Sequence, residues 1–162
     1  MERIDRCRGI NTKHLRCSQG FLSVRGKAIK YLVDTDWIIH YLNGNKEVIS
    51  ILASFKQAGL AISLLSLAEV YEGVYYSLDP VRSEEGFKGF VEGVTVLNLS
   101  DEICKIFAKE RGRLRQKGQF KGQFTDNIDF LIASTALYYR LIILTNNRKD
   151  FEKIEGVQII SV

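Results

Sequence analysis

Five short apolar runs are spaced along the chain from residue 31 to its end, and longer amphipathic stretches separate them. We expect the runs to be strands and the amphipathic stretches to be helices, because apolar residues recur in the latter at helical spacing. Strands separated by helices need crossover connections, which build a parallel sheet covered on both faces. The predicted strands are 31–33, 60–63, 94–97, 141–144 and 157–162. The pattern therefore predicts an α/β fold with a mainly parallel central sheet.

The helices expected between these strands span residues 37–42, 48–55, 66–76, 87–91, 101–114 and 126–139. Two segments break the helical pattern. Residues 77–83 contain the only proline of the chain, and residues 117–124 repeat the tetrapeptide KGQF in tandem. We expect a loop at each, because proline and glycine disfavour helix interiors.

The charges divide the chain into two parts. Residues 1–30 carry eight Lys and Arg against two acids, whereas the rest of the chain carries 15 against 17. The net charge of +4 therefore belongs to the N-terminal segment. We expect residues 1–29 to be a basic, poorly ordered extension without clear helical or strand periodicity, and residues 30–162 to be one domain.

No apolar segment approaches the roughly 20 residues that a membrane helix needs. The first 20 residues are rich in arginine and lack the apolar core of a secretory signal. We therefore expect a cytoplasmic protein that does not bind membranes.

Polar residues follow several of the predicted strands. Asp34 comes directly after the first strand, Glu69 follows the second, and Asn147 and Asp150 follow the fourth. Asp129 lies in the first turn of the helix that precedes the fourth strand. Ligand sites of open parallel sheets lie at the carboxyl ends of the strands, so we expect these side chains to meet at one edge.

Each acid also has a simpler structural interpretation. Ser66 and Glu69 have the spacing of a capping box, in which the glutamate satisfies the start of a helix. Asp126 and Asp129 have the same spacing, with Asp126 as the cap, and Asp34 would suit the N-cap position of the helix that follows it. Asp150 would suit a turn.

A cluster of these acids needs more than capping to be stable. Two carboxylates 4 Å apart repel each other by about 4 kcal/mol at an effective dielectric constant near 20. A divalent cation removes this repulsion, and oxygen ligands without nearby His or Cys favour Mg²⁺ or Mn²⁺. Such an ion suits phosphodiester hydrolysis, because it polarises the phosphoryl oxygen and supplies hydroxide at neutral pH.

Four sequence runs together resemble the PIN-domain ribonucleases, and most closely the VapC toxins of type II toxin–antitoxin pairs. The runs, in chain order, are YLVDTDWIIHYL, ISLLSLAEVYEG, DFLIASTAL and LIILTNNRKDFEKIEGVQII. The resemblance covers residues 30–162. It implies a three-layer α/β/α sandwich, a metal-dependent endoribonuclease and an acidic metal site made by Asp34, Glu69 and Asp129.

The resemblance also implies a supporting set of polar residues. Thr35, Ser66 and Thr145 match small hydroxyl positions near the metal. Asn147 occupies a position that is often acidic in the family, which leaves open whether one or two metals bind; Asp150 is the nearest substitute. Asp36 adds a charge beside Asp34, but a helix should direct its side chain elsewhere.

Substrate and partner are further expectations. Residues 105–121 hold seven basic side chains and one acid, and phosphate contacts from such a run would make RNA binding salt-dependent. A VapC-like toxin should pair with a VapB-like antitoxin that places a basic segment in its acidic groove, and homodimers are usual in the family. The predicted RNA-binding residues are Arg111, Arg113, Arg115, Lys117 and Lys121.

Two other functions fit parts of the sequence. A PIN fold that binds RNA or a partner without cleaving it would suit Asn147, where a carboxylate is missing. A haloacid-dehalogenase-type phosphatase would use Asp34 as nucleophile and Asp36 as acid/base, with Asp126 and Asp129 as its later acidic pair. That class also needs a lysine at a strand end, and none stands in a convincing position.

Overall fold

The computed structural model describes residues 15–18, 21–24, 27–118 and 124–162. Its central sheet has five parallel strands in the spatial order β6-β5-β4-β7-β8, which confirms the predicted fold class. The strands are β4 (Tyr31–Val33), β5 (Leu60–Ser63), β6 (Thr95–Leu97), β7 (Ile142–Leu144) and β8 (Gln158–Ile160).

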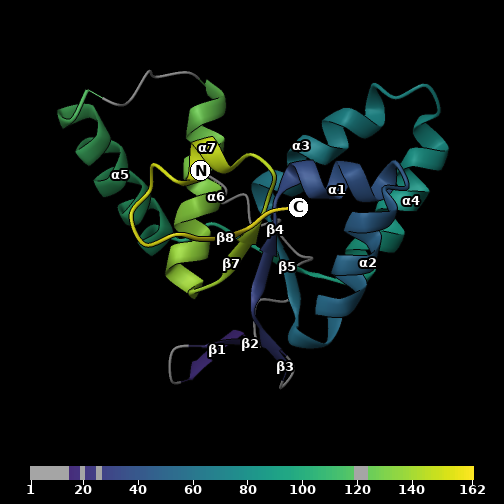
Figure 1. Ribbon diagram of the computed structural model, residues 1–162, viewed down its shortest axis with the longest axis horizontal. Coiled ribbons are helices and arrows are strands. Elements are labelled where there is room, and N and C mark those ends of the chain that lie inside the picture. The colour runs from purple at the N-terminus through teal and green to yellow at the C-terminus, as the bar shows by residue number, and fades with distance from the viewer. Residues whose placement is uncertain (1–14, 19–20, 25–26, 119–123) are drawn as a thin grey trace, which may run out of the picture.

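Helices cover both faces of this sheet, so the domain is a three-layer α/β/α sandwich (Figure 1). One layer contains α1 (Thr35–Leu42), α2 (Lys46–Phe55), the short 3₁₀ helix η1 (Lys56–Ala58), α3 (Leu64–Tyr75) and α4 (Pro80–Glu92). The other contains α5 (Asp101–Gln116), α6 (Phe124–Tyr139) and α7 (Arg148–Phe151).

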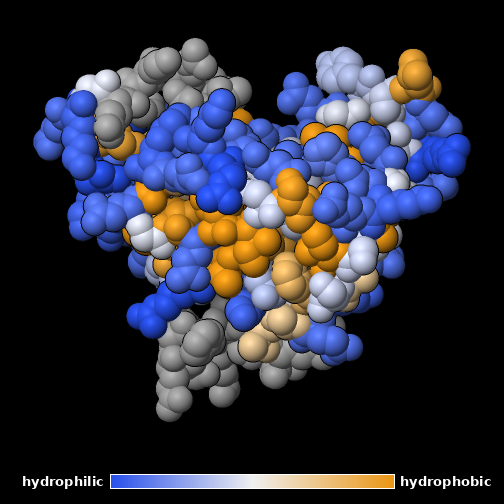
Figure 2. All heavy atoms as spheres, viewed as in Figure 1, coloured by the Kyte–Doolittle hydropathy of each residue, from blue (hydrophilic) through white to orange (hydrophobic). Residues whose placement is uncertain are grey.

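The central strand β4 shows why two cores form. Leu32 packs into the core beneath α5 and α6, whereas Tyr31 and Val33 pack into the core beneath α1 to α4. All three side chains are buried because successive strand residues point to opposite faces and both faces are covered. In Figure 2, an apolar area lies over the strands of the sheet, between hydrophilic helical layers.

The strand order places a topological switch point between β4 and β7. From β4 the chain moves outward through β5 and β6, then returns to β7 and β8 on the other side of β4. Neighbouring connections therefore leave the sheet in opposite directions, which opens a crevice at the carboxyl ends of these two strands. Asp34 and Thr145 are the first residues beyond those ends.

The N-terminal segment differs from the expectation in its described part. Three short strands, β1 (Leu15–Ser18), β2 (Phe21–Val24) and β3 (Lys27–Ile29), form a small antiparallel sheet where no strand was predicted. Ile29 joins the core of the main domain. The strands are short, which explains why residue periodicity did not indicate them. The predicted disorder of residues 1–14 lies outside the described residues.

Gly59 fixes this segment to the main sheet. Its carbonyl oxygen accepts hydrogen bonds from the backbone N–H groups of Lys30 and Tyr31, at 3.1 and 3.2 Å. Its φ is +83°, and a Cβ would overlap the carbonyl oxygen of Ala28. Glycine is therefore required where the chain passes from η1 into β5.

Several element boundaries differ from the prediction. The break at residues 77–83 is shorter than expected, because Pro80 begins α4 and Asp79 caps it; proline suits the first helical position, where no N–H bond is lost. Helix α6 begins at Phe124, so Asp126 lies within its first turn and is not the cap. The middle of the KGQF repeat, 119–123, lies outside the described residues. Within the described part of the chain, no helix is long and apolar enough to span a membrane.

Candidate active site

Asp34 lies at the centre of the site. It follows β4 and is the N-cap of α1, and its side chain is only 4% exposed. One carboxylate oxygen accepts from the backbone N–H of Thr35 at 2.8 Å, and the other accepts from the hydroxyl of Thr145 at 2.7 Å. The capping interpretation of Asp34 is therefore confirmed, and the capping bond leaves its second carboxylate oxygen directed to Thr145.

The electrostatic environment of Asp34 opposes its negative charge. Burial, followed by the neighbouring charge of Asp36, raises its pKa from 3.8 to about 7, and the charge of Asp129 adds to this. The hydrogen bonds from Thr145 and Thr35 act in the other direction but do not compensate. A cation bound beside Asp34 would relieve this repulsion.

Glu69 reaches the same region from α3. The hydroxyl of Thr35 donates a hydrogen bond of 2.5 Å to its carboxylate, so Glu69 is held at the N-terminal turn of α1. The predicted capping box is wrong. Ser63, not Ser66, is the N-cap of α3, and Ser66 is fully buried with its hydroxyl 2.9 Å from that of Ser63. Glu69 is consequently free of any capping role.

Asp129 approaches from the opposite layer, on α6, and its charge acts on Asp34. The charge of Asp129 thus acts on Asp34, while Glu69 is bonded to Thr35, the residue next to Asp34. Among the side chains that the structure describes, no group of three or more His, Cys, Asp and Glu has the geometry of a metal site. The all-oxygen donor chemistry and the unrelieved repulsion at Asp34 nevertheless fit a hard divalent cation.

Asn147 and Asp150 are engaged in other contacts. The backbone N–H of Asn147 donates to the Thr145 hydroxyl at 3.0 Å. Asp150 forms an ion pair of 2.6 Å with Lys153, and this bond, together with one from the Asn147 side chain, lowers the pKa of Asp150. The structure thus shows a local role for Asp150 within α7.

The predicted RNA-binding residues on α5 have different environments. Arg113 bonds to Glu110 at 2.9 Å and to the carbonyl oxygen of Lys153 at 3.1 Å, so its guanidinium is held within the protein. Arg111 is half-buried with its guanidinium 5.7 Å from the ring centre of Phe107. Arg115 and Lys117 are exposed, and Lys121 lies outside the described residues.

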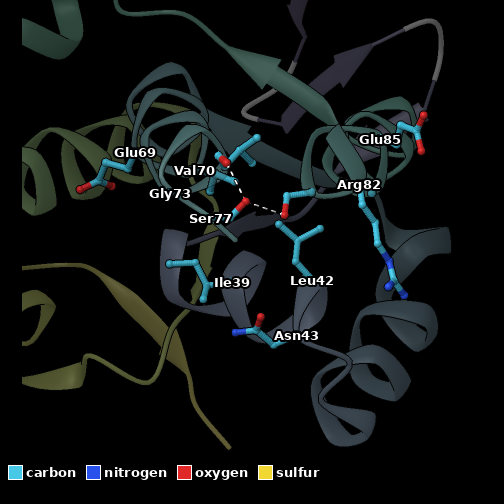
Figure 3. A pocket seen from close by; sticks show the side chains of 12 residues that line it. Ile39, Leu42, Asn43, Glu69, Val70, Gly73, Ser77, Arg82 and Glu85 are labelled. Atoms are coloured by element: carbon cyan, nitrogen blue, oxygen red, sulfur yellow. Dashed lines mark hydrogen bonds between the residues drawn. The ribbon is translucent and has the colours of Figure 1, made fainter. Parts of the chain in front are cut away.

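A groove extends from the acidic edge between α1, α3 and α4 (Figure 3). Its volume is about 610 Å³, its lining includes Val70 and Leu42, and Glu69 lies at one side. Arg82 and Glu85 line it at a distance from Glu69, as Figure 3 shows. The groove therefore connects an apolar surface with one of the predicted site acids.

Two residues at this edge were not predicted to belong to the site. Both carboxylate oxygens of Asp36 are used: one accepts from the backbone N–H of Trp37 and the other from that of Asn146, both at 2.7 Å. The expectation that Asp36 points away from the site is wrong, because this bond crosses to the loop that follows β7. Asn146 provides that backbone N–H. The one sequence signal that could have indicated this residue is its place in the polar loop directly after a strand end.

The family model of the PIN domain matches residues 31–157, which is most of the chain. The chain belongs to the PIN-domain family. The resemblance stated from the sequence is thereby confirmed, and the matched residues include Asp34, Glu69 and Asp129. PIN-domain nucleases generally use a divalent metal ion.

Curated relatives of this PIN domain are VapC ribonucleases. The chain is 28% identical over 131 residues to the tRNA(fMet)-specific endonuclease VapC of Salmonella typhimurium, covering 81% of this chain and 96% of that protein. It is 28% identical over 130 residues to ribonuclease VapC1 of Haemophilus influenzae, covering 79% and 94%.

Solved structures show the same fold. The VapBC2 complex of Rickettsia felis, bound to a promoter DNA fragment, matches with a TM-score of 0.75 and 25% identity over 83% of this chain and 99% of that chain. The DNA-bound VapBC of Salmonella typhimurium matches with a TM-score of 0.73 and 26% identity, over 82% and 98%.

Proposed function

We propose that this PIN domain is a metal-dependent endoribonuclease that hydrolyses RNA phosphodiester bonds as the toxin of a VapBC-type toxin–antitoxin pair. The observation that carries the proposal is the position of Asp34, buried among negative charges at the switch point of a fold whose relatives are named ribonucleases.

The proposed metal ligands are Asp34, Glu69 and Asp129, and the ion is Mg²⁺ or Mn²⁺. The bound ion would supply a Lewis acid for the scissile phosphate and would lower the pKa of a water molecule. The protein contributes orientation: the Thr145 hydroxyl and the Thr35 N–H fix the two oxygens of Asp34, and the Thr35 hydroxyl fixes Glu69.

The remaining assignments rest on the same proposal. Exposed Arg115 and Lys117 at the end of α5 supply phosphate contacts, with Arg111 and Lys121 as further candidates. The partner is a VapB-like antitoxin, as in the VapBC complexes of similar fold. We further propose a homodimer that acts in the cytoplasm, with residues 1–29 as an extension to the domain 30–162.

The experiment is RNA cleavage by the purified protein, with total RNA and a labelled RNA oligonucleotide, in Mg²⁺, in Mn²⁺ and in EDTA. Wild type should cleave only with a divalent ion, and Glu69→Gln should not cleave. The matched control is Glu47→Gln, which changes an exposed glutamate in the first turn of α2 and should cleave like wild type.

The outcomes separate the possible functions. Cleavage that survives EDTA refutes the metal, and equal cleavage by wild type and Glu69→Gln refutes the assigned site. RNA binding without cleavage by any variant favours the non-catalytic PIN domain that Asn147 suggested. Hydrolysis of a small phosphate ester, with RNA left intact, favours the phosphatase.

A further inference from the structure

The hydroxyl of Thr145 is held in one orientation. It donates to a carboxylate oxygen of Asp34 at 2.7 Å and accepts from the backbone N–H of Asn147 at 3.0 Å. Because the accepting side of the oxygen faces Asn147, its proton is directed to Asp34. The orientation of Thr145 therefore depends on the conformation of the loop of residues 145–147, which joins β7 to α7.

This loop is bonded to α1 through Asn146. The backbone N–H of Asn146 donates to Asp36 at 2.7 Å. Its side-chain oxygen accepts from the indole N–H of Trp37 and from the backbone N–H of Val162, both at 3.1 Å. Trp37 is fully buried, so the loop is anchored to a rigid part of the core.

The loop is also bonded to the last residue of β8 and to the residue that follows it. The backbone N–H of Thr145 donates to the carbonyl oxygen of Ile160 at 3.1 Å. The hydroxyl of Ser161 donates to the carbonyl oxygen of Thr145 at 2.6 Å. The backbone of Thr145 is thus held on both sides, while its side chain reaches Asp34.

We propose that Asp36, Asn146 and Ser161 are positioning residues, which together form a loop brace that holds residues 145–147 against α1 and keeps the Thr145 hydroxyl on Asp34. None of the three is among the proposed metal ligands, and their bonds are to other parts of the protein. This inference deepens the proposed function and rests on it for the catalytic consequence. Hydrogen bonds behind a metal ligand fix the direction of its lone pairs, and their loss typically lowers metal affinity or activity about 10- to 100-fold.

A purely structural role would lower stability without a specific effect on the site. The chain offers a control for this distinction in Asn45, the N-cap of α2. Its side-chain oxygen accepts two N–H groups, at 3.0 and 3.2 Å, just as that of Asn146 accepts two. Asn45→Ala and Asn146→Ala therefore remove equivalent bonds, one at the brace and one away from the site.

The first measurement is hydrogen–deuterium exchange of the backbone N–H of Asn147, which needs neither RNA nor metal. Asn146→Ala should accelerate this exchange about tenfold relative to wild type, because the loop opens more easily. Ser161→Ala removes a single bond, remains folded, and should accelerate it by a smaller factor. Asn45→Ala should leave it unchanged.

The second measurement is the rate of cleavage of a labelled RNA oligonucleotide in Mn²⁺. Asn146→Ala should lower kcat about tenfold or more with KM within about twofold of wild type, and Ser161→Ala should act in the same direction. Asn45→Ala should match wild type in both constants.

The two measurements distinguish failure of the brace from failure of the proposed function. If the exchange rate of the Asn147 N–H is the same in Asn146→Ala and Ser161→Ala as in Asn45→Ala, the brace is refuted, whatever the RNA cleavage activity. If the exchange of the Asn147 N–H accelerates but kcat does not fall, the brace does not position the catalytic site and that part of the proposal is refuted. If Asn146→Ala does not fold, Ser161→Ala decides both points. If wild type does not cleave RNA, the proposed function fails and the exchange data alone support or refute the brace.

Discussion

Replacement of Asp34 by asparagine should make the metal-free protein more stable above pH 7 while it abolishes RNA cleavage. Burial and the charge of Asp36 raise the pKa of Asp34 from 3.8 to about 7, and the folded state therefore binds a proton more tightly than the unfolded state. Stability is highest below pH 3.8, where both states bind the proton, and it falls as the pH rises from 3.8 to about 7.

The magnitude follows from these two pKa values. Each pH unit between them is worth about 1.4 kcal/mol, so ionised Asp34 destabilises the metal-free fold by roughly 4 kcal/mol above pH 7. Asparagine carries no charge but keeps only one of the two accepted hydrogen bonds, which costs about 1.5–3 kcal/mol. The net gain at pH 8 is therefore about 1–3 kcal/mol.

The assay is urea unfolding in EDTA at about pH 5 and pH 8, followed by the fluorescence of Trp37, the only tryptophan. With a typical urea slope of about 1–3 kcal/mol/M, the predicted gain moves the unfolding midpoint at pH 8 by about 1 M. At pH 5 only about one pH unit above 3.8 has been crossed, so wild type has lost roughly 2 kcal/mol; the hydrogen bond missing from the variant offsets this, and the variant has no such advantage. Divalent ions should stabilise wild type more than the variant.

The decisive quantity is the change with pH in the difference between the unfolding free energies of wild type and Asp34→Asn. If the unfolding free energies of wild type and Asp34→Asn change in parallel between pH 5 and pH 8, Asp34 is not the group whose ionisation the fold opposes. Asp36→Asn offers a second check, because removal of its charge should lower the pKa of Asp34 and flatten the pH dependence.

Three further substitutions test other features. Gly59→Ala should lower the unfolding free energy by at least about 2 kcal/mol in urea titrations, because its positive φ and its contact with Ala28 admit no side chain; a loss below about 0.5 kcal/mol would contradict this. Arg140→Gly should raise the melting temperature by about 2–4 °C in calorimetry, since Arg140 has a φ of +56°, and no rise would show that this conformation costs nothing. Arg115→Ala with Lys117→Ala should weaken RNA binding and reduce its dependence on salt concentration in titrations, whereas an unchanged salt slope would remove α5 from the RNA surface.

The strands β4, β5 and β7 could be predicted closely because they are short, apolar and largely buried. The predicted boundaries of β4 and β5 agree with the structure, and those of β7 differ by one residue. The antiparallel strands of residues 15–29 were missed, because runs of three or four residues show too little periodicity. Helices α3 and α6 begin two residues before the predicted starts, and at α3 the N-cap is Ser63 in place of Ser66.

Two sequence signals could indicate site residues: a position directly after a predicted strand, and the family resemblance. Asp34 could be found because it follows a buried strand. The bond between Thr35 and Glu69 joins residues 34 positions apart, and the bonds of Asn146 to Trp37 and Asp36 join residues 109 and 110 positions apart. Such contacts depend on rotamers and on the tertiary fold, which no local pattern encodes. Ser66 was misassigned because Ser63 has the same capping chemistry three residues earlier.

The last residues of the chain have a practical consequence for handling the protein. The backbone N–H of Val162 bonds to Asn146, and Ser161 bonds to Thr145. An affinity tag or fluorescent protein fused directly after Val162 would begin beside the loop that orients Asp34. A weak nuclease signal from such a fusion should therefore be compared with protein from which the added sequence has been removed.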